Sequence, residues 1–378
     1  MHELSRRTAL VGLLGTAGAV AVGCTASPTP STSASEAPSL TPTPSPSPSV
    51  DDRPRWPLSG RLLKDEDAAK HAAVAVKVPD NKNEHPQRGL DQADIVFVEL
   101  DGYRDSSGYS STRLVPVFHS SMPDAVGPVR SIRPVDIALL SPMHAIIGNT
   151  GAAPWVLNYV KHNSSYVEGM LSYMNTKYSK IRGSYSIDQS RVRVLGGIKY
   201  FDRATVCHPT ILAKQTKKFR DGPPQVYFPF GDAKVASTVE GKTALSIKVP
   251  WKQGDSYDMS YTWSEKTGTW LRSMPWGPHV LANGKRVAPA NVLVIRAKQH
   301  YDKIYSGTGH DEPIHDIIKN SGAFHYFHGG KYVTGTWNKG DIQDAFTFTL
   351  DDGSPLVMAP GQTYVELANK GAKITVKS

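Results

Sequence analysis

The chain has 378 residues, a formal net charge of +9 and only two cysteines, Cys24 and Cys207. Aromatic residues make up 9% of it and charged residues 20%, which is the composition of ordinary globular material. Two cysteines exclude a scaffold held by several disulfides, so folding must rest on the burial of apolar surface. The basic balance favours anionic partners.

Residues 1–23 are predicted to be an export signal. Arg6 and Arg7 precede an apolar or small run, Ala9–Gly23, which ends directly before Cys24. This run is shorter than the roughly 20 apolar residues that span a bilayer, and paired arginines favour the twin-arginine route. The segment is similar to a lipoprotein signal peptide, after whose cleavage Cys24 would carry acyl chains such as palmitate. An uncleaved anchor with an incidental cysteine is the alternative.

Residues 24–54 are predicted to be the lipidated cysteine and a disordered tether. From Thr25 to Val50 the sequence holds 7 Pro, 8 Ser and 5 Thr and no aromatic residue. Such a tract cannot bury enough apolar surface to offset its chain entropy. In the polyproline II conformation it would reach roughly 80 Å, at about 3.1 Å per residue. We therefore expect a folded part held at the extracytoplasmic side of the cell membrane, where nucleic acid is not a partner.

Residues 55–222 are predicted to form a first domain that mixes strands and helices. A run of turn-forming residues, Asp221-Gly222-Pro223-Pro224, marks its end. Apolar and β-branched runs predict strands over Ala72–Val78, Ala93–Leu100, Leu114–Ser120 and His144–Gly148. Helical patterns follow at Val135–Leu140, Pro154–Lys161 and Ile211–Arg220.

Residues 223–378 are predicted to form a second domain, made mainly of antiparallel sheet. Alternating runs separated by turn signals such as Gly329-Gly330 predict a series of strands. These strands are Val226–Phe230, Ala244–Val249, Tyr257–Trp263, Thr269–Ser273, Asn291–Lys298, Ala323–His328, Lys331–Trp337, Phe346–Leu350, Tyr364–Leu367 and Ile374–Lys377. A mixed first half and a sheet-rich second half predict the α+β class.

Short segments spread along the chain carry a family resemblance. They are His85–Val96, Thr112-Arg113, Phe118–Ser120, Gly127–Pro134, Asn291-Val292, Gly335–Lys339 and Ala359–Tyr364. Their residues and order resemble the YerB-like lipoproteins of the DUF3048 family, over nearly all of residues 70–378. The resemblance implies a membrane-tethered protein with a YerB-like layered sandwich of the α+β class, and it implies no reaction.

Two details of this resemblance concern candidate site residues. The family's Asp-Asn step at the end of the first strand is matched by Asp80-Asn81, which the resemblance therefore adds to a binding site. Similar members have an acidic Glu-Gly-Gly step shortly before the Thr-Arg pair. Here Asp101-Gly102 precedes a longer insertion, so Asp101 or Glu99 would have to replace that acid.

Three arginines and a serine form the main candidate for ligand binding. Arg130 and Arg133 flank Ser131 just before a predicted helix start, and Arg113 lies on a neighbouring predicted strand. Guanidinium groups, a hydroxyl and the free N–H groups of a helix start would together hold a carboxylate or phosphate. Alternatively, the arginines form structural ion pairs with nearby carboxylates, namely Asp94, Glu99 or Asp136.

The basic stretch from Thr176 to Arg220 is a second candidate. It holds eleven basic residues against two acidic ones, so its net charge of +9 matches that of the whole chain. Such a stretch favours salt-sensitive, nonspecific attraction to an anionic cell-wall polymer or an acidic glycan. A solvated surface without a partner is the alternative.

Enzyme and metal motifs are missing from the sequence. We find no nucleophile elbow, no phosphate-binding loop and no His-Glu-x-x-His or paired-cysteine spacing, so no metal or cofactor is expected. The main prediction is thus a binding protein. The competing prediction is a cell-envelope enzyme, a glycan hydrolase or transferase, that uses carboxylates near Arg130 and Arg133. Its candidate catalytic residues are Asp94, Glu99, Asp101 and His119.

Overall fold

The computed structural model describes residues 53–104, 110–168, 171–172, 183–201, 203–251 and 258–378. The predicted signal peptide, Cys24 and most of the predicted tether lie outside these residues. Everything from Arg53 onward that is described belongs to one compact unit. Within the described part of the chain, no helix is both long and apolar enough to cross a bilayer.

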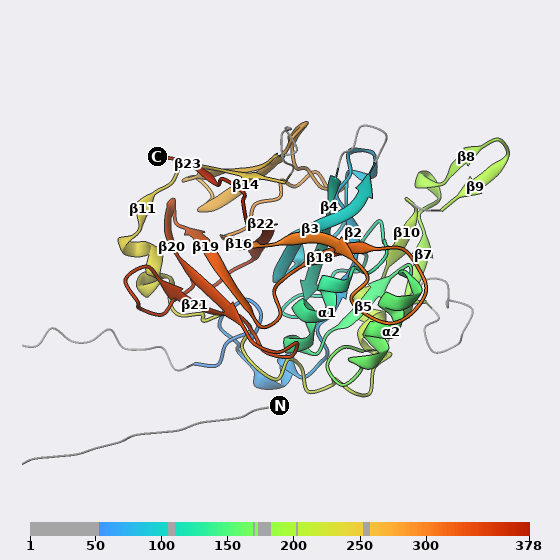
Figure 1. The fold of residues 1–378 in the computed structure, drawn as a ribbon, viewed down its shortest axis with the longest axis horizontal. Coiled ribbons are helices and arrows are strands. Elements are labelled where there is room, and N and C mark those ends of the chain that lie inside the picture. The colour runs from blue at the N-terminus through green and yellow to red at the C-terminus, as the bar shows by residue number, and fades with distance from the viewer. Residues whose placement is uncertain (1–52, 105–109, 169–170, 173–182, 202, 252–257) are drawn as a thin grey trace, which may run out of the picture. The chain divides into compact units, whose positions relative to one another are not determined.

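A twelve-stranded mixed sheet forms the centre of this unit (Figure 1). Ten strands follow one another across it in the order β11 (Lys242–Thr243), β20 (Lys331–Lys339), β19 (Asn320–His328), β16 (Asn291–Ala297), β22 (Thr363–Asn369), β3 (Ile95–Arg104), β4 (Ser110–Phe118), β1 (Val74–Val76), β5 (Ile146–Asn149) and β6 (Leu171–Ser172). Two further strands pair at the sides: β2 (Val78–Pro79) with β4, and β21 (Thr347–Leu350) with β20.

The two halves of the sequence meet in this sheet at β22. This strand runs parallel to both of its neighbours, and Thr363 pairs with Asn291 of β16 on one side and with Ile95 of β3 on the other. All of its residues except the last are buried, as expected for a strand that is paired on both edges and covered on both faces. Residues 55–222 and 223–378 therefore share one sheet, and their division into two domains stays a prediction.

A five-stranded antiparallel sheet is built from the second half alone. Its order is β15 (Gly277–Pro278), β14 (Thr269–Met274), β13 (Asp258–Ser264), β12 (Ser246–Pro250) and β23 (Thr375–Lys377). Side chains of β14 alternate between half-buried and buried, so one face of the sheet packs on the core. The predicted strands of this region are confirmed to within a few residues.

Three short antiparallel pairs complete the strands of the described chain. They are β7 (Tyr185–Ile187) with β10 (Thr205–Cys207), β8 (Arg193–Leu195) with β9 (Ile198–Tyr200), and β17 (Gln299–Asp302) with β18 (Glu312–His315). The β8–β9 hairpin projects from the rest of the unit, at the upper right of Figure 1. None of these pairs was predicted from the sequence.

The helices are short. The α-helices are α1 (Pro134–Leu140), α2 (Pro154–His162) and α3 (Pro209–Ala213). The 3₁₀ helices are Glu66–Ala69, Lys82–Glu84, Leu90–Gln92, Ser141–Met143, Gln189–Arg191, Ala233–Val235 and Ser237–Glu240. The first two α-helices confirm predictions, and the described chain as a whole is strand-rich with few helices, which agrees with the α+β class.

Two predicted elements are wrong. The helix predicted over Ile211–Arg220 ends after Ala213, because the buried Thr216 hydroxyl accepts a hydrogen bond from the Lys218 N–H at 3.0 Å and donates one to Glu168 at 2.8 Å. The strand predicted over Val226–Phe230 is replaced by irregular chain with a single bridge to Met358. Pro223 and Pro224 just before this segment and Pro229 within it lack the N–H donors that a strand needs.

Candidate functional site

A cleft of about 490 Å³ lies at the base of the β8–β9 hairpin and is lined from both halves of the sequence. One wall is the loop after β2, the other is the segment around the 3₁₀ helix Gln189–Arg191, and the loop before β16 touches it through Ala282. Its charged and titratable lining residues are His85, Arg88, Asp188, Arg191, Arg193 and Arg203. Among the described residues that line the cleft there are thus four arginines and one carboxylate, so this lining is basic.

Backbone hydrogen bonds fix the loop that carries Arg88. The Arg88 N–H donates to the Gly127 carbonyl at 2.8 Å, and the Gly127 N–H donates to the Arg88 carbonyl at 3.3 Å. The Ala282 N–H donates to the Gln87 carbonyl at 2.8 Å. Gly89 has a φ of 88°, and a Cβ there would lie 2.6 Å from a backbone carbonyl oxygen, so only glycine fits. The first wall of the cleft is therefore rigidly placed by its neighbours.

Arg191 ties the second wall of the cleft to the first. Its Nη1 donates to the Pro86 carbonyl at 2.8 Å and its Nη2 to the Glu84 carbonyl at 2.6 Å, while partial burial lowers its pKa. Arg88 is half exposed, and its Nη2 lies 3.3 Å from the Asp188 carboxylate. An exposed pair of this kind contributes about 0–1 kcal/mol, so the anionic group of a ligand can compete for Arg88.

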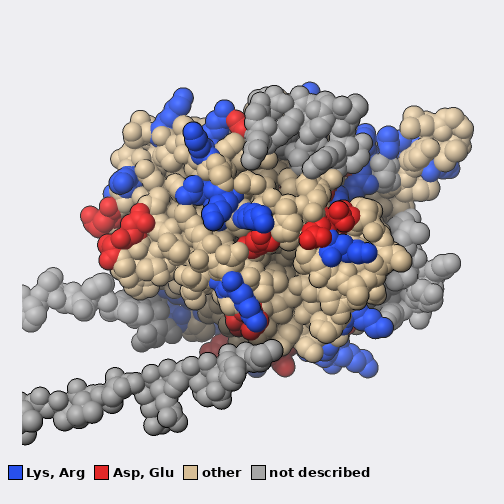
Figure 2. Space-filling view, viewed as in Figure 1, with Lys and Arg blue, Asp and Glu red and all other residues tan. Residues whose placement is uncertain are grey.

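Three of these arginines, Arg191, Arg193 and Arg203, come from the basic stretch predicted from the sequence. Figure 2 shows Lys and Arg side chains around the base of the hairpin, at the upper right, whereas the outer part of the hairpin is mostly uncharged. Positions 176–182 and 202 of the stretch lie outside the described residues. Sequence reasoning found the charge of this region but missed its partner Arg88, because only the fold brings the loop after β2 beside it.

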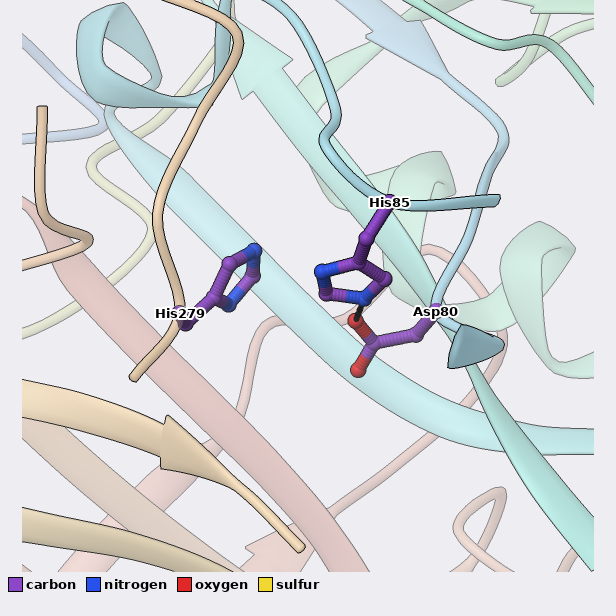
Figure 3. Close-up of side chains that lie close together, drawn as sticks. All are labelled: Asp80, His85 and His279. Atoms are coloured by element: carbon purple, nitrogen blue, oxygen red, sulfur yellow. Dashed lines mark hydrogen bonds and ion pairs between the residues drawn. The ribbon is translucent and has the colours of Figure 1, made fainter. Parts of the chain in front are cut away.

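A buried polar cluster lies next to the cleft (Figure 3). His85 lines the cleft, and its Nε2 lies 3.1 Å from Oδ1 of Asp80. The other carboxylate oxygen of Asp80 accepts hydrogen bonds from Arg272 at 2.8 Å and from Thr112 at 2.9 Å. Burial opposes ionisation of Asp80, but Arg272 and His85 outweigh it and hold the pKa of Asp80 below its usual range. Asp80 is thus an ionised anchor between β2 and β14.

Asp80, His85 and His279 come close enough together to suggest a metal site, since their ligand atoms all lie within 4.8 Å of one another. Burial and the nearby Arg272 lower the pKa of His279 well below its usual value, so its ring is neutral. Its Nδ1 lies 2.7 Å from Arg272, which can only donate, so its Nε2–H donates to Gln87 at 2.9 Å. Both ring nitrogens are occupied and a guanidinium supplies the positive charge, so we assign no metal to this cluster.

The predicted ligand-binding arginines lie elsewhere, and each contacts a carboxylate. Arg113 pairs with Asp101 and donates to the Ser131 carbonyl at 2.6 Å. Arg133 donates from Nε to the Asp101 carbonyl at 2.7 Å and lies 3.2 Å from the Glu312 carboxylate. The structure thus brings Arg113, Ser131 and Arg133 together. The guanidinium groups of the two arginines are mostly buried among protein acceptors.

Arg130 points to a different carboxylate, that of Glu84, and its side chain is 22% exposed. The same glutamate accepts a hydrogen bond from Asn81 at 3.2 Å. Asp80, by contrast, belongs to the buried cluster next to the cleft, so the predicted pair Asp80-Asn81 is split between two environments. The predicted set of six binding residues is therefore spread over three separate ion-pair groups.

Lys77 forms a fully buried ion-pair group with Glu99 and Asp136, directly below the helix start. Its ammonium contacts the Glu99 carboxylate and lies 2.7 Å from Asp136, whose other oxygen accepts the Arg133 N–H at 2.7 Å. Burial and the neighbouring Asp136 raise the pKa of Glu99 to about 8, although Lys77 opposes the shift. Glu99 is thus a carboxylate with a raised pKa near the predicted arginines, and its side chain has no exposed surface.

The remaining catalytic candidates are also inside the fold. Asp94 accepts hydrogen bonds from the N–H groups of His119 and Ser120 at 2.8 and 2.7 Å, and burial raises its pKa. His119 Nε2 lies 2.9 Å from the Ala69 carbonyl, and burial lowers its pKa to about 4. Asp101 is 2% exposed and paired with two arginines. The structure therefore assigns structural contacts to all four candidates.

The buried Glu99 leads to a prediction about pH. Its pKa rises from 4.5 to about 8 on folding, so between these values the folded chain holds a proton that the unfolded chain has released. The free energy of unfolding should therefore fall as pH rises, by up to about 1.4 kcal/mol per pH unit from this group. Glu99→Gln should remove that slope, so the variant gains stability relative to wild type from pH 5 to pH 8. Urea unfolding at several pH values measures this, and parallel curves would contradict it.

Residues 58–191 match the "Protein of unknown function (DUF3048) N-terminal domain", and residues 247–365 match the corresponding C-terminal domain. The two matches cover more than half of the sequence. The chain belongs to the DUF3048 family. The resemblance found in the sequence is thereby confirmed, while the β8–β9 hairpin falls between the two matched segments.

The DUF3048 relatives include a protein of Bacillus subtilis (strain 168) named "Putative lipoprotein YerB", which is 23% identical over 317 residues, covering 82% of this chain and 85% of that protein. The crystal structure of YerB from Bacillus subtilis matches with a TM-score of 0.64 at 20% identity, over 85% of this chain and all of that one. At this level of identity the structural match establishes a YerB-like fold.

Proposed function

We propose that this DUF3048 protein is a lipid-anchored, extracytoplasmic protein that binds an anionic component of the cell envelope in its arginine-lined cleft. The observation that carries the proposal is that the described lining of a single open cleft includes four guanidinium groups and one carboxylate. The anchor would be an acylated Cys24, which the lipoprotein name of the YerB relative supports. We also propose that the YerB-like fold is a layered sandwich.

The chemistry of the cleft favours a polymer of carboxylates or phosphates. Arginine binds both groups through two parallel hydrogen bonds, which makes it the preferred residue for such recognition. Four arginines from three segments give several weak contacts along a chain of negative charges. Arg88 is half exposed and only loosely held by Asp188, so it can turn to the ligand.

In this proposal Arg113, Arg130 and Arg133 stabilise the fold, because each contacts a carboxylate of the protein. The competing function, a glycan hydrolase or transferase, would need a carboxylate beside these arginines that a substrate can reach. Its carboxylates Glu99 and Asp101 are at most 2% exposed. A catalytic acid or base must lie within hydrogen-bond reach of its substrate.

The test replaces two cleft arginines by a neutral side chain. We expect Arg88→Gln combined with Arg193→Gln to weaken binding to polyphosphate or polygalacturonate at least about tenfold, since each charge-assisted hydrogen bond contributes about 1.5–3 kcal/mol. Titration calorimetry of the full chain in detergent measures the affinity. Comparing the two polymers distinguishes a phosphate ligand from a carboxylate ligand.

Arg61→Gln combined with Lys266→Gln, which lies outside the basic stretch, is the matched control. Both side chains are exposed and neither lines the cleft, while the net charge changes by the same amount. The control should bind like the wild type, and both variants should keep the wild-type melting temperature. Equal weakening in the two variants would mean that net charge alone attracts the polymer, and the proposed site would be wrong.

A further inference from the structure

The β8–β9 hairpin exposes a concentration of large apolar side chains. In the described part of the chain thirteen such side chains are exposed, and five of them lie between positions 194 and 201. They are Val194, Leu195, Ile198, Tyr200 and Phe201, with 59, 54, 61, 38 and 39% of their surface exposed. Contiguous apolar surface of this kind marks a place where a soluble protein meets a membrane or another protein.

The hairpin is built to present this surface at its end. Leu195 pairs with Ile198 next to a two-residue turn, Gly196-Gly197, whose φ values of 56° and 79° suit a tight hairpin turn. A Cβ at either glycine would meet nothing within 4 Å in the described part of the chain, so there is open space beside the turn. In Figure 1 the hairpin extends beyond the sheet that supports it.

Apolar side chains lie on both faces of the hairpin end. Val194 and Leu195 are neighbours on one strand, so they point to opposite faces, yet each is more than half exposed. A protein partner that packed on one face would leave the other in water. An interface that surrounds the end of the hairpin buries both faces at once, and a lipid bilayer provides such an interface.

Basic and aromatic side chains follow directly behind the apolar end. Arg193 lies across from Tyr200, with its guanidinium 5.7 Å from the centre of that ring, and Lys199 lies across from Val194. From Gln189 to Phe201 the sequence has three basic residues and no acidic one. Three strand residues span about 10 Å, which is the depth that interfacial segments reach between headgroups and acyl chains.

We propose that the β8–β9 hairpin inserts its end into the interface of an anionic lipid bilayer. Leu195, Ile198 and Val194 would enter the upper acyl region, Tyr200 would lie at headgroup level, and Arg193 and Lys199 would contact lipid phosphates. Insertion would place the basic cleft at the membrane surface. This proposal goes beyond polymer binding in the cleft and does not depend on it.

Weak insertion is sufficient for a tethered protein. An anchor in the same membrane raises the effective concentration of the hairpin at the bilayer, so no high intrinsic affinity is needed. The chain length predicted for the tether, residues 24–54, allows the folded part both to reach the membrane surface and to leave it. The hairpin would then decide how the folded part is oriented when it returns.

The test attaches a polarity-sensitive fluorophore to the hairpin of the full chain. Leu195→Cys is labelled, and the protein is reconstituted into vesicles of phosphatidylglycerol and phosphatidylcholine. Cys207 is fully buried and its thiol pKa is raised by burial, so it does not react, and the unsubstituted chain reports any labelling at Cys24. Leu245→Cys is the matched control, since Leu245 is 47% exposed and follows β11, far from the hairpin in Figure 1.

We expect blue-shifted emission at position 195 and quenching by headgroup-proximal nitroxide lipids that is at least about twofold stronger than at position 245. Replacing Lys199, which does not line the cleft, by Glu should reduce the quenching in anionic vesicles. Equal, water-like emission at both positions would overturn the proposal. So would a blue shift that depends on protein concentration and persists in detergent, because a second copy of the chain would then cover the hairpin.

Discussion

Arg272→Met is expected to lower the free energy of unfolding by about 3–5 kcal/mol, because it leaves a fully buried carboxylate without its cation. Arg272 has no exposed surface, and its Nη2 lies 2.8 Å from Asp80 and its Nη1 2.7 Å from His279. Methionine fills much of the same volume, so lost packing accounts for little of the effect. Denaturant unfolding followed by circular dichroism measures the change.

A double-mutant cycle identifies the cause. Asp80→Asn removes the charge that Arg272 neutralises, so the double variant Asp80→Asn with Arg272→Met should be more stable than Arg272→Met alone. Arg61→Met, at an exposed position, should change stability by no more than about 0.5 kcal/mol. A loss below about 1 kcal/mol for Arg272→Met would show that the cluster does not hold the two halves together.

Lys77→Met is also expected to lower the free energy of unfolding by about 3–5 kcal/mol, because it too leaves a buried carboxylate without its cation. The lysine and both of its carboxylate partners have no exposed surface. Because Glu99 has a pKa raised to about 8, it is mainly protonated at neutral pH, and the uncompensated charge is that of Asp136. The cost should therefore increase as pH rises, because the variant lacks the ammonium that favours ionisation of Glu99.

Lys285→Met is the matched control for Lys77→Met. Its ammonium lies 2.9 Å from the Asp91 carboxylate, but its side chain is 68% exposed. Exposed pairs contribute about 0–1 kcal/mol, so this variant should unfold almost like the wild type. Similar losses at the two lysines would refute the role assigned to burial.

Local patterns predicted most individual strands, because alternation of apolar residues needs only the neighbouring sequence. The parallel position of β22 between β16 and β3 was not predictable in this way. The pairing of Thr363 with Ile95 joins positions far apart in the sequence, and alternation does not indicate which strands pair. The short pairs β8–β9 and β17–β18 were missed as well, since their apolar residues show no clear alternation.

The candidate site was only partly predictable, for a related reason. The sequence shows which side chains are charged, but the fold determines which carboxylate each arginine meets. Arg133 and Arg113 converge on Asp101, and Arg130 meets Glu84, so the pattern that suggested a ligand also fits internal pairing. Arg88 could not be identified as a binding residue from the sequence, because only the fold places it beside Arg191 and Arg193, which lie on a distant segment.

The salt dependence of polymer binding shows whether the cleft recognises an anionic polymer through its charges. The affinity of the full chain for polyphosphate is measured between about 50 and 500 mM NaCl, a range over which surface charge interactions become strongly screened. We expect a steep loss of affinity with salt for the wild type and a clearly shallower one for Arg88→Gln with Arg193→Gln, since fewer charged contacts remain. Identical salt slopes for the two proteins, or binding by the wild type that does not respond to salt, would contradict recognition of an anionic polymer in this cleft.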